Sequence, residues 1–191
     1  FGLCGLAFSA SLAFMKRKMA AWMPDPRVRI LLCGALISFL ILLLHQGRYA
    51  GLGTNLIDMS QGAGEIFWYD WLLKGALTVL TLSAGFQGGE VTPLFSIGAS
   101  LGAVLAPAFG LSAASGAALG YASVFASASN TLIAPILIGA EVFGLQALPF
   151  FVVSVAFSRL FNHGRSIYPQ RGNSGVSGGE NGNIRPSSEK D

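Results

Sequence analysis

Long apolar runs separated by short polar segments dominate this chain. One run extends from Phe1 to Met15, a second from Ile30 to Leu44, and a last one from Val142 to Ser158. Between them, the stretch from Val91 to Ala140 contains no acidic, basic or histidine side chain. Apolar runs of this kind are typical of helices embedded in a bilayer. The pattern therefore predicts an all-α integral membrane protein.

Glycine and proline interrupt the longest uncharged stretch and change how it is interpreted. The interrupting prolines are Pro93, Pro107 and Pro135. Gly98 and Gly102 form a GxxxG pair, and residues 112–120 carry a second ridge of small side chains, a pattern that lets helices approach closely. Irregular backbone at membrane depth is tolerated only where protein buries it or a watery cavity adjoins it. We therefore expect short, broken and tightly packed helices rather than two plain spans.

Composition excludes several classes of function. Of the 191 residues 52% are hydrophobic and only 11% are charged, whereas soluble domains average about 25% charged. With a mean hydropathy of +0.59, this rules out a soluble enzyme, a nucleic-acid binder and a disordered chain. The two cysteines, Cys4 and Cys33, lack the spacing of a zinc site or a disulfide framework. No metal or other cofactor is indicated.

The distribution of charge predicts the topology. Five basic residues fall between the first two apolar runs: Lys16, Arg17, Lys18, Arg27 and Arg29. This bias marks a cytoplasmic connection, so the first two helices form a hairpin whose loop (residues 16–29) is cytoplasmic. The glycine-rich segment from His45 to Asp70 then becomes an extracytoplasmic loop, and Lys74 marks the start of the next helix. Trp68, Tyr69 and Trp71 are typical of an interfacial aromatic belt.

The two ends of the chain lead to further expectations. Residues 170–191 are rich in Gly, Ser and Asn, which predicts a disordered cytoplasmic tail after a membrane domain spanning residues 1–169. The chain begins with Phe1 rather than Met and shows no signal-peptide pattern, so we expect a preceding segment to be missing.

The strongest candidate site is the segment from Gly85 to Pro93, with the sequence GFQGGEVTP. Glycines allow main-chain N–H groups to turn toward a ligand, and Pro93 fits the first position of a new helix, whose N-terminus favours anions. Glu90 stands between apolar segments, where an ionised acid is costly, so we expect its neutral form to be accessible. A neutral carboxyl group can donate a hydrogen bond to an anion. The alternative is a purely structural acid that caps the helix.

Other signals point more weakly to chemistry. Residues 98–102 match GxSxG, the hydrolase nucleophile elbow, but Ser100 lies in a helical pattern without the required preceding strand. His45 and His163 are isolated and lack metal-ligand spacing, which favours interfacial positions. Glu141 ends an apolar helix, and a structural bond to a nearby loop is the favoured interpretation.

The segment GFQGGEVTPLFSIGASLGAVLAP resembles the CLC chloride channel and transporter family, at its GGxFxP anion loop. KGALTVLTLSAG is similar to the helix before that loop, IAPILIGAEVFG to a later helix ending in glutamate, and SIYPQ to the start of the final helix. The resemblance covers about residues 1–170. It implies the C-terminal half of an inverted-repeat transporter built from broken and tilted helices.

The loop departs from the common pattern, since Val91 replaces the phenylalanine. GGEVTP is similar to the bacterial fluoride-selective branch, whose members exchange fluoride for protons. The resemblance implies that Glu90, Thr92 and Tyr168 handle the anion and the proton, with the Val91 amide as a backbone contact after Gly89. Pro93, Glu141, Gly98 and Gly102 take structural roles.

The resemblance also implies the setting and the partners. These are a bacterial inner membrane, fluoride or chloride ions and protons, and a homodimer through the stretch from Ile133 to Phe157. The family's first half, with its gating glutamate, is absent here. The alternatives are a CLC-type chloride channel or exchanger and, more distantly, a membrane scaffold that transports nothing.

Overall fold

The computed structural model of the protein describes residues 1–44, 47–161 and 167, and within this part of the chain there are helices but no strands. The α-helices in chain order are α1 (Gly2–Trp22), α2 (Pro26–Leu43), α3 (Thr54–Asp58), α4 (Asp70–Ala84), α5 (Val91–Leu105), α6 (Ala113–Ser129), α7 (Ile133–Phe143) and α8 (Leu148–Leu160). Shorter helical turns are η2 (Met59–Ala63, a π-helix), η3 (Ala106–Phe109) and η4 (Leu145–Ala147). The prediction of an all-α fold is confirmed.

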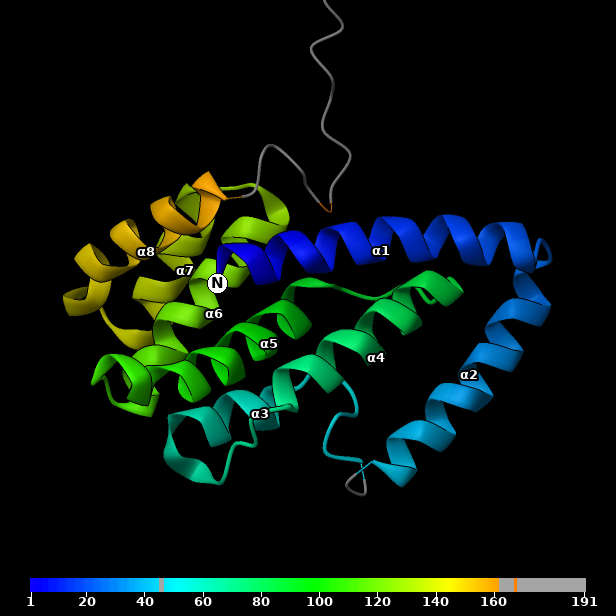
Figure 1. Ribbon diagram of the computed structural model, residues 1–191, viewed down its shortest axis with the longest axis horizontal. Coiled ribbons are helices and arrows are strands. Elements are labelled where there is room, and N and C mark those ends of the chain that lie inside the picture. Colours follow the sequence, from blue (N-terminus) through cyan, green and yellow to red (C-terminus); the bar gives the residue numbers. More distant parts are fainter. Residues whose placement is uncertain (45–46, 162–166, 168–191) are drawn as a thin grey trace, which may run out of the picture.

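Helices α5 and α6 form the centre of the molecule. Figure 1 shows α5 between α6 on one side and α4 and α3 on the other, with α1 running across them and α7 and α8 beyond α6. The central side chains of α5 are buried from Pro93 to Ala103, and α6 is buried almost throughout from Gly116 to Ser129. The largest core cluster joins these two helices to α1 and α4. Because α5 is enclosed, its N-terminus occupies a fixed position.

Glycines bring the backbones of α5 and α6 into direct contact. Gly98 faces Gly120, and Gly102 faces Gly116, each against the partner's carbonyl group. A Cβ atom added to Gly102 would lie 2.6 Å from the carbonyl carbon of Gly116, closer than real Cβ atoms come. In a membrane, where apolar burial gives helices little reason to associate, this close packing supplies much of the attraction.

We expect Gly102→Ala to lower the free energy of unfolding by about 1–3 kcal/mol, the usual cost of overpacking a close contact. The matched control is Gly75→Ala in α4, whose new Cβ would meet only Ile97 Cδ1 at 3.8 Å and which gains helix propensity. Thermal unfolding of both purified variants in detergent measures the difference. Equal midpoints for the two variants would contradict the packing argument.

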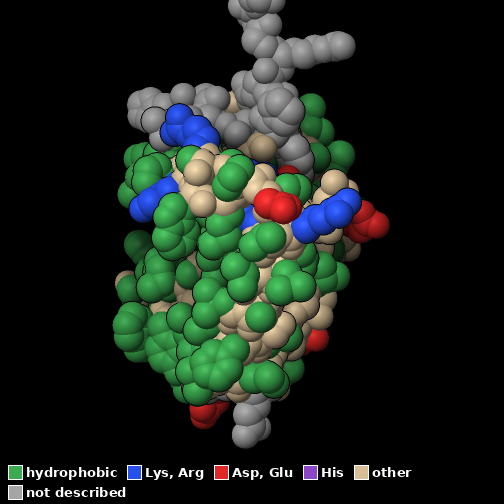
Figure 2. Space-filling view, turned by 90° about the vertical axis from the view of Figure 1, so that its right-hand side faces the viewer, with side chains coloured by type: hydrophobic (Ala, Val, Ile, Leu, Met, Phe, Trp, Pro, Cys, Tyr) green, Lys and Arg blue, Asp and Glu red, His purple; other side chains and the backbone are tan. Residues whose placement is uncertain are grey.

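Helix α2 lies at the edge of the molecule and exposes an apolar surface. Leu31, Leu36, Phe39 and Leu42 are exposed, and only Cys33 and Ile37 are buried. Figure 2 views the side of the molecule on which α2 lies: hydrophobic side chains cover its middle, and most charged side chains gather toward one end. Two helical stretches, Pro26–Leu43 and Val91–Phe109, are long and apolar enough to cross a membrane, although length and composition alone are weak evidence.

The segment from residue 47 to residue 70 is packed structure rather than the open loop that its polar composition suggests. It contains α3 and η2, and Tyr49, Leu56 and Ser60 are buried. The expected helix start at Lys74 is wrong: α4 begins at Asp70. Charge does not mark a helix boundary here because both Asp70 and Lys74 are buried and hydrogen-bonded inside the protein.

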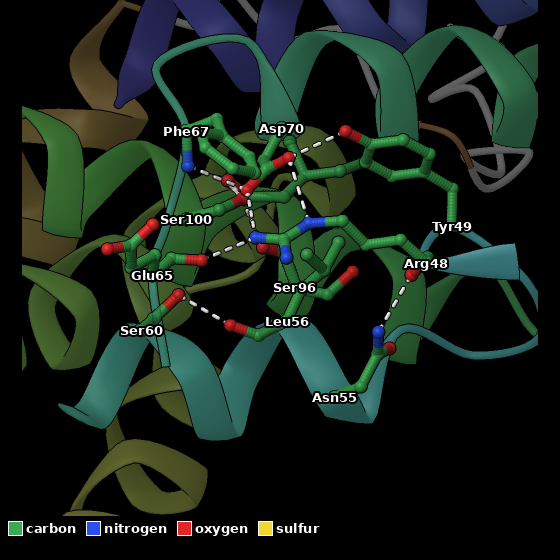
Figure 3. A network of polar contacts seen from close by, with 11 residues as sticks. Arg48, Tyr49, Asn55, Leu56, Ser60, Glu65, Phe67, Asp70, Ser96 and Ser100 are labelled. Carbon is green, nitrogen blue, oxygen red and sulfur yellow. Dashed lines mark hydrogen bonds and ion pairs between the residues drawn. The ribbon is translucent and has the colours of Figure 1, made fainter. Parts of the chain in front are cut away.

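A polar network centred on Asp70 holds this segment against α4 (Figure 3). The Asp70 carboxylate accepts hydrogen bonds from Arg48 Nε and Nη2, at 3.2 and 2.7 Å, and from the Tyr49 hydroxyl at 2.6 Å. The Phe67 N–H donates to the same carboxylate at 2.9 Å. One turn later, Lys74 Nζ donates to the carbonyl oxygens of Tyr49 and Gly51. Buried charges are tolerated because each one is paired or hydrogen-bonded.

The last apolar run is divided differently from the sequence pattern. The pattern ends one helix at Glu141 and places an apolar run from Val142 to Ser158, whereas α7 continues to Phe143 and α8 begins at Leu148. Gly144 has a φ of +98°, a conformation that glycine adopts without strain, and Pro149 starts the next helix. The expected loop contact of Glu141 is not found: its side chain is exposed and has no hydrogen bond to a described residue.

Candidate functional site

The candidate loop begins where α4 ends, and a residue from a distant helix fixes that end. Gly85 adopts a left-handed conformation (φ +102°), which closes α4 and favours glycine at this position. Arg29, in the first turn of α2, donates from Nε to the carbonyl oxygen of Ala84 at 3.0 Å. This contact satisfies one of the last carbonyl groups of α4 and places a cation at the helix C-terminus, where cations are favourable. Residues 86–89 then lead, exposed, to α5.

Helix α5 begins at Val91, with Glu90 as its N-cap. Pro93 is therefore the third helical residue and not the first, as the sequence suggested. Proline is tolerated there because the first turn of a helix has N–H groups without intrahelical partners, so a missing N–H removes no helical bond. The Leu94 N–H bonds to the carbonyl oxygen of Glu90 at 3.1 Å, which leaves the earlier amides available to a ligand.

The Glu90 side chain does not cap this helix. Its backbone is helical (φ −76°, ψ −14°), and its carboxylate accepts no hydrogen bond from the first turn of α5. The capping alternative is therefore wrong. The half-buried carboxyl group instead lines a cavity of about 460 Å³, which we call the loop cavity. Its lining residues are Lys16, Ala20, Arg29, Leu82, Ser83, Gly85, Phe86, Gln87, Gly88 and Glu90.

The other predicted site residues lie apart from the loop cavity. Thr92 and Val91 are half-buried in the first turn of α5, and Gly89 is exposed; none of the three lines the cavity. Two successive steps of about 100° turn Thr92 roughly 200° from Glu90 around the helix axis, so the two side chains leave α5 in different directions. Tyr168 lies outside the described residues. The neighbouring Ile167 donates from its N–H to the carbonyl oxygen of Ala128 near the end of α6.

The residues of the GxxxG and GxSxG patterns lie buried in the interior of α5. Gly98 and Gly102 form the contact with α6 described above. Ser100, from the GxSxG match, is fully buried and its hydroxyl donates to the Ser96 carbonyl oxygen at 2.7 Å within α5. This position suits helix packing and not a nucleophile. His45 and His163 lie outside the described residues.

Three cavity residues could not be singled out from the sequence: Lys16, Arg29 and Ser83. Each is unremarkable in its own segment, as part of a basic loop or of a small-residue helix. They come together because the ends of α1 and α4 and the start of α2 meet in the fold. Within the described residues, no group of three or more His, Cys, Asp or Glu side chains is placed to hold a metal ion.

Comparison with known proteins places this geometry in a family. The chain is 38% identical, over 178 residues, to the chloride/fluoride channel protein of Pseudomonas syringae pv. tomato, covering 88% of this chain and 38% of that protein. It is also similar to the crystal structure of a CLC-type fluoride/proton antiporter, at 56% identity and a TM-score of 0.86, covering 88% of this chain and 43% of that one.

This chain therefore spans less than half the length of these relatives. The voltage gated chloride channel family matches residues 1–163, which include every helix described above and the whole candidate loop. This protein belongs to the voltage gated chloride channel (CLC) family.

Proposed function

We propose that this chain forms one half of the anion pathway of a membrane transporter that exchanges fluoride for protons. The observation that carries the proposal is that the Glu90 carboxyl group, at the N-terminus of α5, forms no capping hydrogen bond with that helix. A proton acceptor thus stands beside main-chain N–H groups that attract an anion. The 56% identity to a fluoride/proton antiporter supports fluoride and proton as the transported pair.

Fluoride is small and strongly hydrated, so a site that binds it must replace water with close and strong donors. Under this proposal, the Thr92 hydroxyl, the Val91 amide and the Tyr168 hydroxyl donate to fluoride. Glu90 takes up and releases the proton that moves in the opposite direction.

We also propose the arrangement in the membrane. Residues 16–29 and the tail face the cytoplasm of a bacterial cell, in line with their basic side chains. Helices α7 and α8 form the surface between two copies of the protein. Exposed apolar side chains on these helices support this: Ile133, Leu137, Phe150, Val153 and Phe157.

Reconstitution of the complete two-half transporter in liposomes tests the function. We expect fluoride efflux at least about tenfold faster than chloride efflux, with protons moving in the opposite direction. Electrodes for fluoride, chloride and pH measure the three fluxes.

The second candidate is a channel that conducts both halides, and it is favoured by the similarity to the chloride/fluoride channel protein of Pseudomonas syringae. It predicts similar efflux of both anions without proton movement, and that result would overturn the exchange proposal. Absence of any anion flux would favour the scaffold alternative.

A further inference from the structure

We propose that the loop cavity is a separate binding site for a small inorganic anion, at which the transported ion is held before it reaches the first turn of α5. This inference rests on the proposed function for the identity of the anion, which is fluoride. The site itself is assigned from three side chains on three different helices: Lys16, Arg29 and Ser83.

The first argument is an unpaired hydroxyl group. Ser83 is only 3% exposed, and its Oγ atom is buried without a hydrogen-bond partner among the described residues. Other buried serines of the described residues donate to a backbone carbonyl, either within their own helix, as Ser100 and Ser129 do, or in another helix, as Ser158 does. Because a buried hydroxyl without a partner is unfavourable, such a group calls for an acceptor. Ser83 lines the loop cavity, so an acceptor bound there would meet this need.

The second argument is the charge of the walls. Lys16 and Arg29 both line the cavity, and neither forms an ion pair with a described residue. Arg29 is held in place by its bonds to the carbonyl oxygens of Ala84 and Met23, so its charge is fixed at the cavity wall. A fixed cation, a second cation and a hydroxyl donor together match a small anion and not a cation or an apolar molecule.

The third argument links the cavity to proton exchange through Glu90. Two cations and one ionised acid give the cavity a formal charge of +1, and protonation of Glu90 raises it to +2. The charge on Glu90 therefore influences how tightly the cavity holds an anion. Since Thr92 leaves α5 in another direction, the loop cavity is distinct from the position proposed for the anion beside Thr92.

Lys16→Gln tests the charge, with Lys18→Gln as the matched control. Lys18 lies two residues after Lys16 on α1. Its ammonium group lies over the Phe14 ring, and it does not line the cavity. Initial fluoride flux is measured in liposomes carrying the complete transporter, over a range of fluoride concentrations. We expect Lys16→Gln to raise the half-saturating fluoride concentration about fivefold, the effect of one unit charge at close range in water.

Ser83→Ala tests the hydroxyl group by removing one oxygen atom. We expect a rise of several-fold in the half-saturating fluoride concentration. In fluoride-free buffer the thermal unfolding midpoint should not fall, because no hydrogen bond within the protein is lost. An unchanged half-saturating concentration would overturn the assignment of Ser83, and a lower midpoint would show that its hydroxyl has a structural partner instead.

Equal behaviour of Lys16→Gln and Lys18→Gln would overturn the inference as a whole. The proposed function fails separately. If Glu90→Gln retains wild-type coupling while Lys16→Gln still differs from Lys18→Gln, the exchange mechanism is wrong, and the binding site in the loop cavity is supported. If Glu90→Gln loses coupling while the two lysine variants behave alike, the opposite holds.

Discussion

Replacing Glu90 by glutamine is expected to abolish proton-coupled fluoride exchange while the protein still folds. Glutamine has nearly the same size, but it cannot take up or release a proton. Because the Glu90 side chain caps no helix, its replacement removes no hydrogen bond that holds α5 in place. We expect proton uptake driven by a fluoride gradient to fall to the level of empty liposomes. A pH electrode and a fluoride electrode measure both fluxes on the same vesicles.

Glu141→Gln is the matched control for this experiment. Glu141 is also an acid on an apolar helix, but it is exposed and does not line the loop cavity. We expect wild-type coupling in this variant. Wild-type coupling in Glu90→Gln as well would contradict the mechanism. Loss of coupling in both variants would show that the Glu90 carboxyl group acts only through the overall charge of the protein.

Replacing Asp70 by asparagine is expected to produce the largest loss of stability, about 3 kcal/mol in the free energy of unfolding, as when one member of a buried ion pair is removed. Asp70 is fully buried, and its carboxylate receives two bonds from Arg48, whose side chain is only 14% exposed. Without the negative charge, the guanidinium group would stay buried and uncompensated. Thermal or denaturant unfolding in detergent measures the loss.

Asp58→Asn provides the control for Asp70→Asn. Asp58 ends α3 at an exposed position and forms no ion pair with a described residue, so its replacement should change the unfolding free energy little. Tyr49 also takes part in the network around Asp70, as a hydrogen-bond donor. Burial raises the pKa of its phenol, and the bond to Asp70 raises it further, so the hydroxyl stays a donor at neutral pH. A similar midpoint for Asp58→Asn and Asp70→Asn would contradict the role of the network.

The sequence predicted the membrane class, the helical fold and the broken character of the central stretch, since these follow from local hydropathy and from the placement of glycine and proline. It was less reliable wherever a charged residue was buried. The sequence pattern places a helix start at Lys74, whereas this lysine lies buried within α4. Its burial is compensated by hydrogen bonds to the carbonyl groups of residues 49 and 51, more than twenty positions away. Such long-range compensation leaves no local signal.

The candidate site shows the same division. The segment GGEVTP pointed to Glu90 from the sequence alone, because an isolated acid beside glycines and a helix start is rare in an apolar stretch. That sequence also left open whether Glu90 caps α5. The tertiary structure decided this question, since the direction of a side chain depends on the backbone angles at the start of the helix.

The sequence by itself determined that this protein is an all-α membrane protein with one exceptional acid, because hydropathy, charge and chain breaks are local properties. Only the tertiary structure placed Lys16, Arg29 and Ser83 around that acid. Their meeting depends on how α1, α2 and α4 pack, and the packing is set by contacts between residues far apart in the chain. The electrostatic surroundings of Glu90, and therefore its proposed coupling of proton and anion, are a property of the fold.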